Sequence, residues 1–457
     1  MSTTNDPGLP SGIPGPREGQ QLQRIMRVRD GLAVTIGIVI GAGILGTPGL
    51  IAGYLGDPWI ILAVWLLGGV VAALSTLLLA EMAAALPKAG GKYVYAAEAF
   101  GPVAGFVAGW SELLVTRALS GAAKAVLIAT YIIGLAGGSG SVGLLAVVVV
   151  LGFAFLHLGG LKIGTVFQNV STAIKVVFLL AVAAAAIAAG ETRGFGLEAV
   201  FKPEVSFLLG FALAYQAVAF TYYGWEDAAK MAEETMDPGK ALPRILIGGA
   251  AAVAVLYLLI NVAFLTTLTP AEMAASDLVA RDAIAAVLGS TAGVVITAGS
   301  LLILVSSLNV NFLGMPRVAF ALSRDRLAPS AFRKVSERGT PTLALWFITA
   351  LIGLLALSGA FELLIRFMMM VAVTIDLMVL LAFFRLRKTR PDLARPLRVP
   401  AYPWLPGLTI VLYVAIIAIF VGTQPRLALG GGAMVAALTV AGVVTARRLR
   451  LRPLGVD

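Results

Sequence analysis

The sequence contains no cysteine and a single histidine, His157. Disulfide bonds, thiolate ligands and multi-histidine metal centres are therefore excluded. Charged residues are also few, at 13% of the chain, whereas 59% of the 457 residues are hydrophobic and the mean hydropathy is +0.94. So few charges cannot form the polar surface of a water-soluble globule of this length, and the composition predicts a polytopic membrane protein.

Apolar runs fill most of the chain after its first 29 residues. A helix needs about 20 apolar residues to cross a bilayer. Twelve stretches approach or exceed this length, at residues 30–54, 58–86, 102–136, 142–160, 164–189, 205–234, 242–268, 291–323, 342–358, 361–386, 406–422 and 430–446. They predict an all-α protein with twelve transmembrane helices and both termini on one side. Residues 1–29, rich in Pro, Gly, Ser and Gln, predict a disordered tail.

Lysine and arginine are distributed unevenly over the connections. With the N-terminus inside, 26 of the 34 basic residues fall in inside segments and four in outside loops. The positive-inside rule then predicts that both termini are cytoplasmic. The net charge of +10 is explained by this topology, so no nucleic-acid partner is expected. Short loops and small tails favour a prokaryotic inner membrane, with lipid around the bundle.

Two short breaks interrupt apolar segments near mid-span, at Gly41-Ala42-Gly43-Ile44 in the first segment and Phe220-Thr221-Tyr222-Tyr223-Gly224 in the sixth. Glycine allows backbone geometry that a helix interior forbids, and an unpaired amide in hydrocarbon needs protein, water or a ligand to satisfy it. The breaks are therefore candidate ligand sites, with close helix packing as the alternative explanation of the glycines. Their odd spacing along the chain predicts two five-helix halves related by an inverted repeat.

Further motifs occur in a consistent order. They are Glu81 through Gly101 with Gly109-Trp110, Phe220-x-Tyr222-x-Gly224-Trp225, Glu233-Glu234, Asp237-Pro238, Leu242-Pro243-Arg244, Ser307-Leu308-Asn309, Arg317, Ala321-Leu322-Ser323-Arg324-Asp325, Thr340-Pro341, Pro391-Asp392-Leu393-x-Arg395-Pro396 and Tyr402-Pro403. Together with the first break, this set resembles the amino acid, polyamine and organocation (APC) transporter superfamily over roughly residues 28–406. It is most similar to the L-type amino acid transporter branch.

The resemblance implies a LeuT-type fold, with a 5+5 inverted repeat plus two additional helices. It also implies sodium-independent secondary transport of amino acids by alternating access, without a cofactor or an enzymatic step. The implied units are a core at residues 30–390 with halves 30–189 and 205–386, a linker with helices 11 and 12 at 391–446, and a basic cytoplasmic tail at 447–457.

An α-amino acid carries a carboxylate, which the free backbone amides at a helix break can bind, and an ammonium, which the free carbonyls there can bind. We expect the substrate carboxylate at the amides of Ala42, Gly43 and Ile44, and the α-ammonium at carbonyls near Ile40 and 220–222. The expected substrate-binding residues are Ile40, Gly41, Ala42, Gly43, Ile44, Phe220, Thr221, Tyr222, Tyr223 and Glu226. The family resemblance also suggests that Phe220 and Trp225 are aromatic gates over the substrate.

Two residues depart from the L-type pattern. Tyr223 occupies a position that is often glycine, and Glu226 one that is often asparagine. The tyrosine should shrink the side-chain pocket, whereas the carboxylate could attract a cationic side chain. Because these cues point to different substrates, specificity stays open.

Lys175, in the fifth segment, is the sharpest ionisable candidate because a lone ammonium is costly in hydrocarbon. It matches the lysine that in sodium-independent relatives resembles a built-in replacement for the coupling cation, with Ser306 and Ser307 as candidate hydroxyl partners. It could act as a proton carrier or as a fixed strut. Arg117 and Lys124 share a helix face, and we expect Asp376 to neutralise one of them.

Several alternatives remain at this point. A polyamine or other organic cation is the main alternative substrate, and exchange and proton coupling are both open. A channel is less favoured because no selectivity loop is repeated, and an enzyme because no nucleophile or metal cluster is apparent. The outer loop Gly137–Ser141 has no cysteine, so no disulfide-linked heavy subunit is expected.

Overall fold

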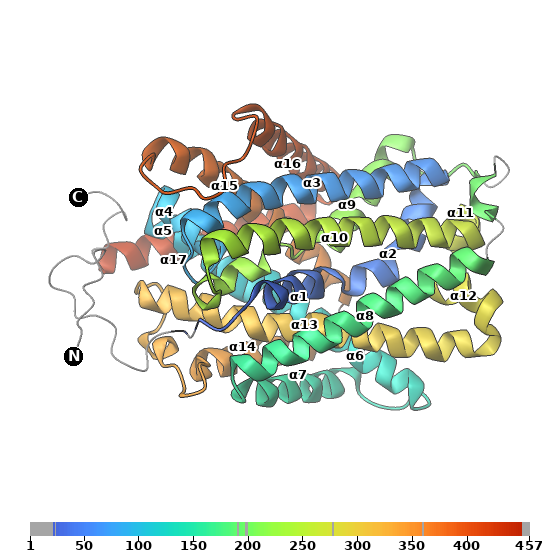
Figure 1. Ribbon diagram of the computed structural model, residues 1–457, viewed down its shortest axis with the longest axis horizontal. Coiled ribbons are helices and arrows are strands. Elements are labelled where there is room, and N and C mark those ends of the chain that lie inside the picture. Colours follow the sequence, from blue (N-terminus) through green and yellow to red (C-terminus); the bar gives the residue numbers. More distant parts are fainter. Residues whose placement is uncertain are drawn as a thin grey trace.

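The computed structural model describes residues 22, 24–189, 192–196, 200–276, 278–358 and 361–449. Within these ranges the chain is helical, apart from turns and a single parallel bridge between Met26 and Thr235. The long helices run side by side along the long axis of the molecule (Figure 1). The all-helical architecture predicted from the sequence is confirmed.

The helices have the following bounds: α1 Val28–Val39, α2 Ala42–Leu55, α3 Pro58–Ala85, α4 Lys92–Phe100, α5 Pro102–Ser111, the π-helical turn η1 Glu112–Thr116, α6 Arg117–Leu135, α7 Val142–Leu158, α8 Leu161–Ala189, η2 Arg193–Phe195, α9 Phe207–Tyr222, η4 Asp227–Glu234, α10 Pro238–Thr267, α11 Pro270–Ala275, α12 Val279–Leu288, η5 Gly289–Thr291, α13 Ala292–Arg324, η6 Ser330–Arg333, α14 Thr342–Ala356, α15 Phe361–Thr389, α16 Trp404–Thr423 and α17 Pro425–Arg448.

Nine helical segments in the described ranges are long and apolar enough to cross a membrane. The pair α1 and α2, bent by 42°, forms a tenth candidate. Helices α7 and α14 are apolar but only 17 and 15 residues long, and they coincide with the fourth and ninth predicted segments. The protein is thus a multi-pass membrane protein, whereas the count of twelve crossings stays a prediction.

Both predicted breaks interrupt regular helix. In the first segment α1 ends at Val39 and α2 begins at Ala42, so the interruption is at Ile40 and Gly41. In the sixth, α9 ends at Tyr222 and the chain continues through Gly224, whose φ of +119° favours glycine, into the 3-10 segment η4. The second half of the sixth segment is therefore not the α-helix that its apolar composition suggested.

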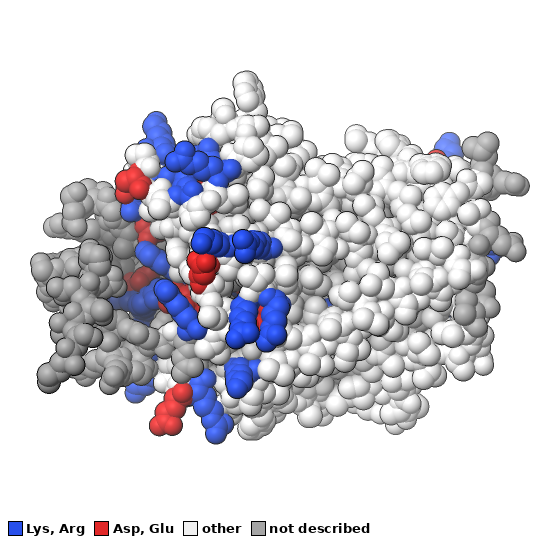
Figure 2. All heavy atoms as spheres, in the orientation of Figure 1, with Lys and Arg blue, Asp and Glu red and all other residues white. Residues whose placement is uncertain are grey.

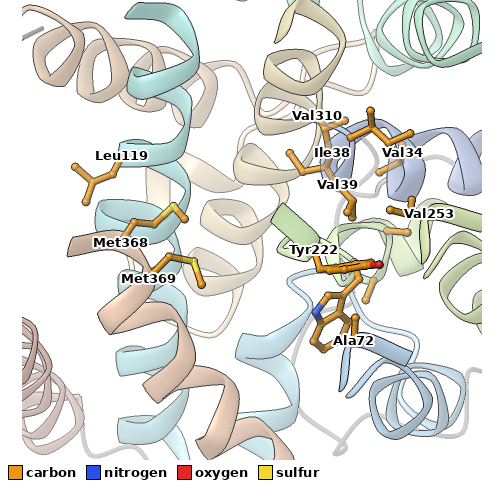
Figure 3. Packing of buried hydrophobic residues seen from close by; sticks show 14 of the residues in the cluster. Val34, Ile38, Val39, Ala72, Leu119, Tyr222, Val253, Val310, Met368 and Met369 are labelled. Carbon is orange, nitrogen blue, oxygen red and sulfur yellow. The ribbon is translucent and has the colours of Figure 1, made fainter. Parts of the chain in front are cut away.

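The helices around the first break form one continuous core. Figure 3 shows Ile38 and Val39 at the end of α1 converging with Val253 of α10 and Val310 of α13, beside Tyr222 of α9. Their apolar side chains exclude solvent from the break, so the polar backbone groups exposed there depend on neighbouring side chains for hydrogen bonds.

Basic residues gather at one end of the bundle, on the left in Figure 2. Among the exposed basic residues, Arg29 and Lys240 lie in the first turns of α1 and α10, and Lys388 and Arg447 lie in the last turns of α15 and α17. Three basic residues that we counted as connection charges lie instead in the interior, namely Lys92, Lys230 and Arg317. Most of the charge asymmetry remains after this correction.

The chain before α1 is held against η4. The amides of Ile25 and Met26 donate to the Glu234 carbonyl at 3.0 and 2.8 Å, and the Met236 amide donates to Met26 at 2.8 Å. The end of the predicted 1–29 tail is therefore part of the fold. The rest of that tail, residues 1–21 and 23, and residues 450–457 of the C-terminal tail lie outside the described residues.

Candidate functional site

The end of α1 leaves carbonyl oxygens without helical partners, and side chains from three other helices satisfy them. Lys175 Nζ of α8 donates to the Gly37 and Ile40 oxygens at 2.6 and 2.8 Å. Ser307 Oγ of α13 donates to the Ile38 oxygen at 3.0 Å, and Tyr257 Oη of α10 to the Val39 oxygen at 2.8 Å. These bonds allow the helix to end in the middle of the bundle.

The start of α2 has the opposite polarity. The first amides of a helix, here those of Ala42, Gly43 and Ile44, have no partner within the helix and lie at the positive end of its dipole. Gly41 and Gly43 line a small cavity beside this end of the helix. The break therefore combines satisfied carbonyls with a donor end suited to an anion.

Five helical elements contribute to this cavity. Its lining residues are Ile38, Val39, Gly41, Gly43, Arg117, Ser120, Ala123, Lys124, Phe220, Thr221, Tyr223 and Met368. Five of the expected site residues are in this set: Gly41, Gly43, Phe220, Thr221 and Tyr223. Phe220 is half-buried and lines the cavity as an aromatic gate would.

Other expected site residues lie elsewhere. Ile40 and Ile44 are buried in the apolar core, and the Ile40 carbonyl expected at the substrate ammonium accepts from Lys175. Tyr222 and Trp225 line a second cavity, between α3, α9, α15 and α16, so Trp225 does not face the first cavity.

Residues of α6 were missed as part of the cavity wall. Arg117, Ser120, Ala123 and Lys124 lie within two turns of that helix. The sequence did carry a signal, because two basic residues seven positions apart in an apolar segment share one helix face. What the pattern could not tell was which neighbouring helices that face meets.

Gly43 also has a packing role. A Cβ atom at this position would lie 2.7 Å from Thr221 Cα, closer than real Cβ contacts allow. The Thr47 hydroxyl donates to the Gly43 carbonyl at 2.9 Å and lies 3.0 Å from the Thr221 hydroxyl. Close contact between α2 and α9 therefore requires glycine here, in addition to any role in binding.

Lys175 is fully buried in α8, and Ser307 bonds to the same turn of α1. Ser306, the other expected partner, bonds instead to Gln168 and Ser171 at 3.2 and 3.1 Å. An ammonium that donates to two carbonyls occupies the kind of oxygen cage that a small cation would use.

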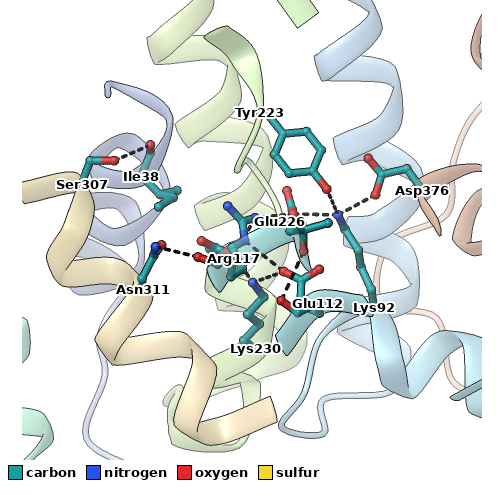
Figure 4. A network of polar contacts seen from close by, with 12 residues as sticks. Ile38, Lys92, Glu112, Arg117, Tyr223, Glu226, Lys230, Ser307, Asn311 and Asp376 are labelled. Carbon is teal, nitrogen blue, oxygen red and sulfur yellow. Dashed lines mark hydrogen bonds and ion pairs between the residues drawn. The ribbon is translucent and has the colours of Figure 1, made fainter. Parts of the chain in front are cut away.

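A network of buried charges lies beside the cavity (Figure 4). Arg117 pairs with Glu226 at 2.5 Å and with Glu112 and Asp227 at 2.9 Å each. Lys230 pairs with Glu112 at 2.5 Å and also with Asp227. This cluster ties η1 and α6 to the segment that follows the break in the sixth span.

The expected partner of Asp376 was wrong. Its carboxylate pairs with Lys92 at 2.5 Å, and neither Arg117 nor Lys124 forms an ion pair with it in the described part of the chain. Lys92 had been read as a connection charge, but its side chain is only 2% exposed. The structural reason is that the start of α4 folds inward against α15, which sequence spacing does not reveal.

Glu226 is also held by the network. Its Oε1 atom lies 2.7 Å from Lys92 Nζ and 2.5 Å from Arg117, and the residue does not line the first cavity. Burial alone lowers the pKa of the Lys92 ammonium, but the Asp376 and Glu226 carboxylates raise it well above its ordinary value. Lys92 therefore stays charged at neutral pH, and Glu226 is engaged by this chain's own cations.

Broken helices beside a cavity in a multi-pass bundle are typical of membrane transport proteins. The sequence profile of the family described as amino acid permease matches residues 30–444. The chain belongs to this amino acid permease family, and its function is amino acid transport.

Individual relatives agree with this assignment. The serine/threonine exchanger SteT of Bacillus subtilis is 30% identical over 83% of this chain and 87% of its own length. The mouse b(0,+)-type amino acid transporter 1 is 26% identical over 88% and 84% of the two chains. The human cystine/glutamate transporter is 27% identical over 90% and 83%. The predicted L-type resemblance is confirmed.

Proposed function

We propose that this protein is a sodium-independent amino acid exchanger with its substrate site at the first break. The observation that carries the proposal is the polarity of that break, where side chains satisfy the α1 carbonyls and the α2 amides lie beside the cavity. The substrate carboxylate binds these amides, and Phe220 closes over the side chain. The relative named as a serine/threonine exchanger supports exchange.

Sodium independence follows from Lys175. Its ammonium already donates to two carbonyls at the end of α1, so the positive charge that this site needs is covalently attached to α8. A fixed ammonium cannot leave with the substrate, so it acts as a strut and carries no coupling energy.

The membrane orientation follows from the charge asymmetry. We assign the basic end of the bundle to the cytoplasmic face of the cell membrane, with both termini there. Residues 30–390 form the transport core, and α16 and α17 are added to its periphery. The protein acts as a carrier and performs no covalent chemistry.

Counterflow in liposomes tests this function. Purified protein is reconstituted with unlabelled amino acids inside, and uptake of labelled L-amino acids is followed with sodium or choline outside. We expect saturable, stereoselective uptake that requires amino acid in the lumen and is the same in both salts.

Each competing mechanism gives a different result in this assay. Uptake into vesicles without internal amino acid, driven by an imposed pH gradient, would indicate proton symport instead of exchange. Inhibition by putrescine but not by amino acids would identify a polyamine carrier, and unsaturable ion current would identify a channel.

A further inference from the structure

In the part of the chain that the structure describes, one basic residue of the cavity wall has no carboxylate as an ion-pair partner. Lys124 of α6 lines the cavity and is 7% exposed. Its Nζ atom lies 3.5 Å from the Ser307 carbonyl, at the outer limit of a hydrogen bond. Within the described ranges of the chain, no Asp or Glu forms an ion pair with it.

The other basic residue of the wall differs in this respect. Arg117 is neutralised by Glu112, Glu226 and Asp227. No carboxylate is among the residues that line the cavity. Lys124 is thus a buried amine without an ion-pair partner among the described residues, on a wall that also carries the amide end of α2.

A buried ammonium without a counterion is expensive, and in transporters such groups mark substrate pathways. The two charges of a neutral amino acid cancel, so that substrate leaves Lys124 uncompensated. A substrate with a second carboxylate would supply the missing counterion. A substrate with a cationic side chain would be repelled, because Glu226 is already occupied by Lys92 and Arg117.

We propose that Lys124 binds the side-chain carboxylate of the substrate, and that the preferred substrates are acidic amino acids. Ser120 lies one helical turn before Lys124 on the same face and offers a hydroxyl donor to the same carboxylate. This inference rests on the proposed substrate site, which it deepens by assigning its charge selectivity.

The test compares nearly isosteric substrates that differ in charge. In the counterflow assay, glutamate and aspartate should compete with labelled substrate at concentrations at least about tenfold below those of glutamine and asparagine. Lysine should not compete. Because each acid is matched in shape by its amide, the difference isolates the side-chain charge.

The variant Lys124→Met should remove this preference. We expect acidic amino acids to lose about tenfold or more in apparent affinity, while glutamine keeps its affinity or gains. Lys162→Met is the matched control, because Lys162 is exposed at the start of α8 and should leave the preference intact.

The outcomes separate this inference from the proposed function. Uptake of neutral or cationic amino acids with no acidic preference, unaffected by Lys124→Met, would overturn the inference and leave amino acid exchange standing. Absence of uptake for every amino acid would overturn the function itself. If Lys124→Met does not fold, the increase in melting temperature of the wild-type protein can be compared with glutamate and with glutamine. Glutamate should stabilise the protein more, and equal stabilisation would reject the inference.

Discussion

At the scale of single residues, the buried cations of this protein fall into distinct roles. Lys175 donates to backbone carbonyls, Lys92 and Arg117 pair with carboxylates, and Lys124 has no carboxylate partner among the described residues. The same kind of charge therefore stabilises a helix end, joins elements or remains available to a substrate. The partner of each cation decides its role.

Replacing Lys175 tests its role as a strut. Lys175→Met leaves the Gly37 and Ile40 carbonyls without this donor, and each unpaired carbonyl should reduce the stability of the fold by about 1–3 kcal/mol. We expect counterflow uptake to fall by at least about tenfold and the melting temperature to drop. Lys162→Met on the same helix is the control, and wild-type uptake by Lys175→Met would refute the strut.

The pairing of Asp376 with Lys92 is open to a double-mutant cycle. Lys92→Met leaves the buried Asp376 carboxylate without its ion-pair partner, which costs about 3 kcal/mol or more, whereas Asp376→Asn leaves Lys92 only its pairing with Glu226. The double variant should be clearly more stable than the sum of the single effects predicts, as measured by thermal unfolding in detergent. Asp376→Asn combined with Lys124→Met should be additive. Coupling in that second pair, and none in the first, would contradict the structure.

At the scale of elements, the broken α1–α2 segment is the central feature. Its carbonyl end is satisfied by α8, α10 and α13, and its amide end packs on α9. The break is thus held by four helices and is not a locally weak helix. Glycine is needed where α2 meets α9, as well as where a ligand would approach.

Substitutions at two glycines of α2 distinguish an effect on helix packing from an effect on substrate binding. Gly43→Ala places a Cβ atom 2.7 Å from Thr221 Cα, whereas Gly46→Ala meets nothing within 4 Å. We expect Gly43→Ala to lower uptake by at least about tenfold and Gly46→Ala to leave it nearly unchanged. Thermal unfolding and substrate affinity should be measured together. A Gly43→Ala protein with wild-type affinity and reduced stability would assign Gly43 to packing alone and count against the proposed site.

At the scale of the whole molecule, charged residues gather toward one end of the face drawn in Figure 2, and few lie on the remainder of that face. The family profile spans residues 30–444 and therefore includes α16 and most of α17. The strand-like segment at Met26 closes the basic end against η4.

The absence of cysteine makes the orientation simple to measure. Ser141, which precedes α7, and Lys240, in the first turn of α10, are exposed and lie at opposite predicted faces. A membrane-impermeant maleimide should label Ser141→Cys in intact cells and Lys240→Cys only after permeabilisation. The reverse labelling pattern would invert the proposed topology, and the cysteine-free parent provides the blank.

Much of the fold could be predicted from the sequence. Hydropathy located a helix in every predicted apolar segment, because the bilayer fixes how long an apolar run must be. Glycine patterns located both breaks to within a few residues, since backbone freedom is a local property.

What the sequence by itself determined is the membrane class, the position of the helices and breaks, and the family. Only the tertiary structure decided that Asp376 pairs with Lys92, that Glu226 is occupied, and that Lys124 faces the cavity without a carboxylate partner among the described residues. The physical reason is the separation along the sequence over which each interaction acts. Helix formation and backbone breaks depend on neighbouring residues, whereas the partner of a buried charge depends on how distant helices rotate and pack against one another.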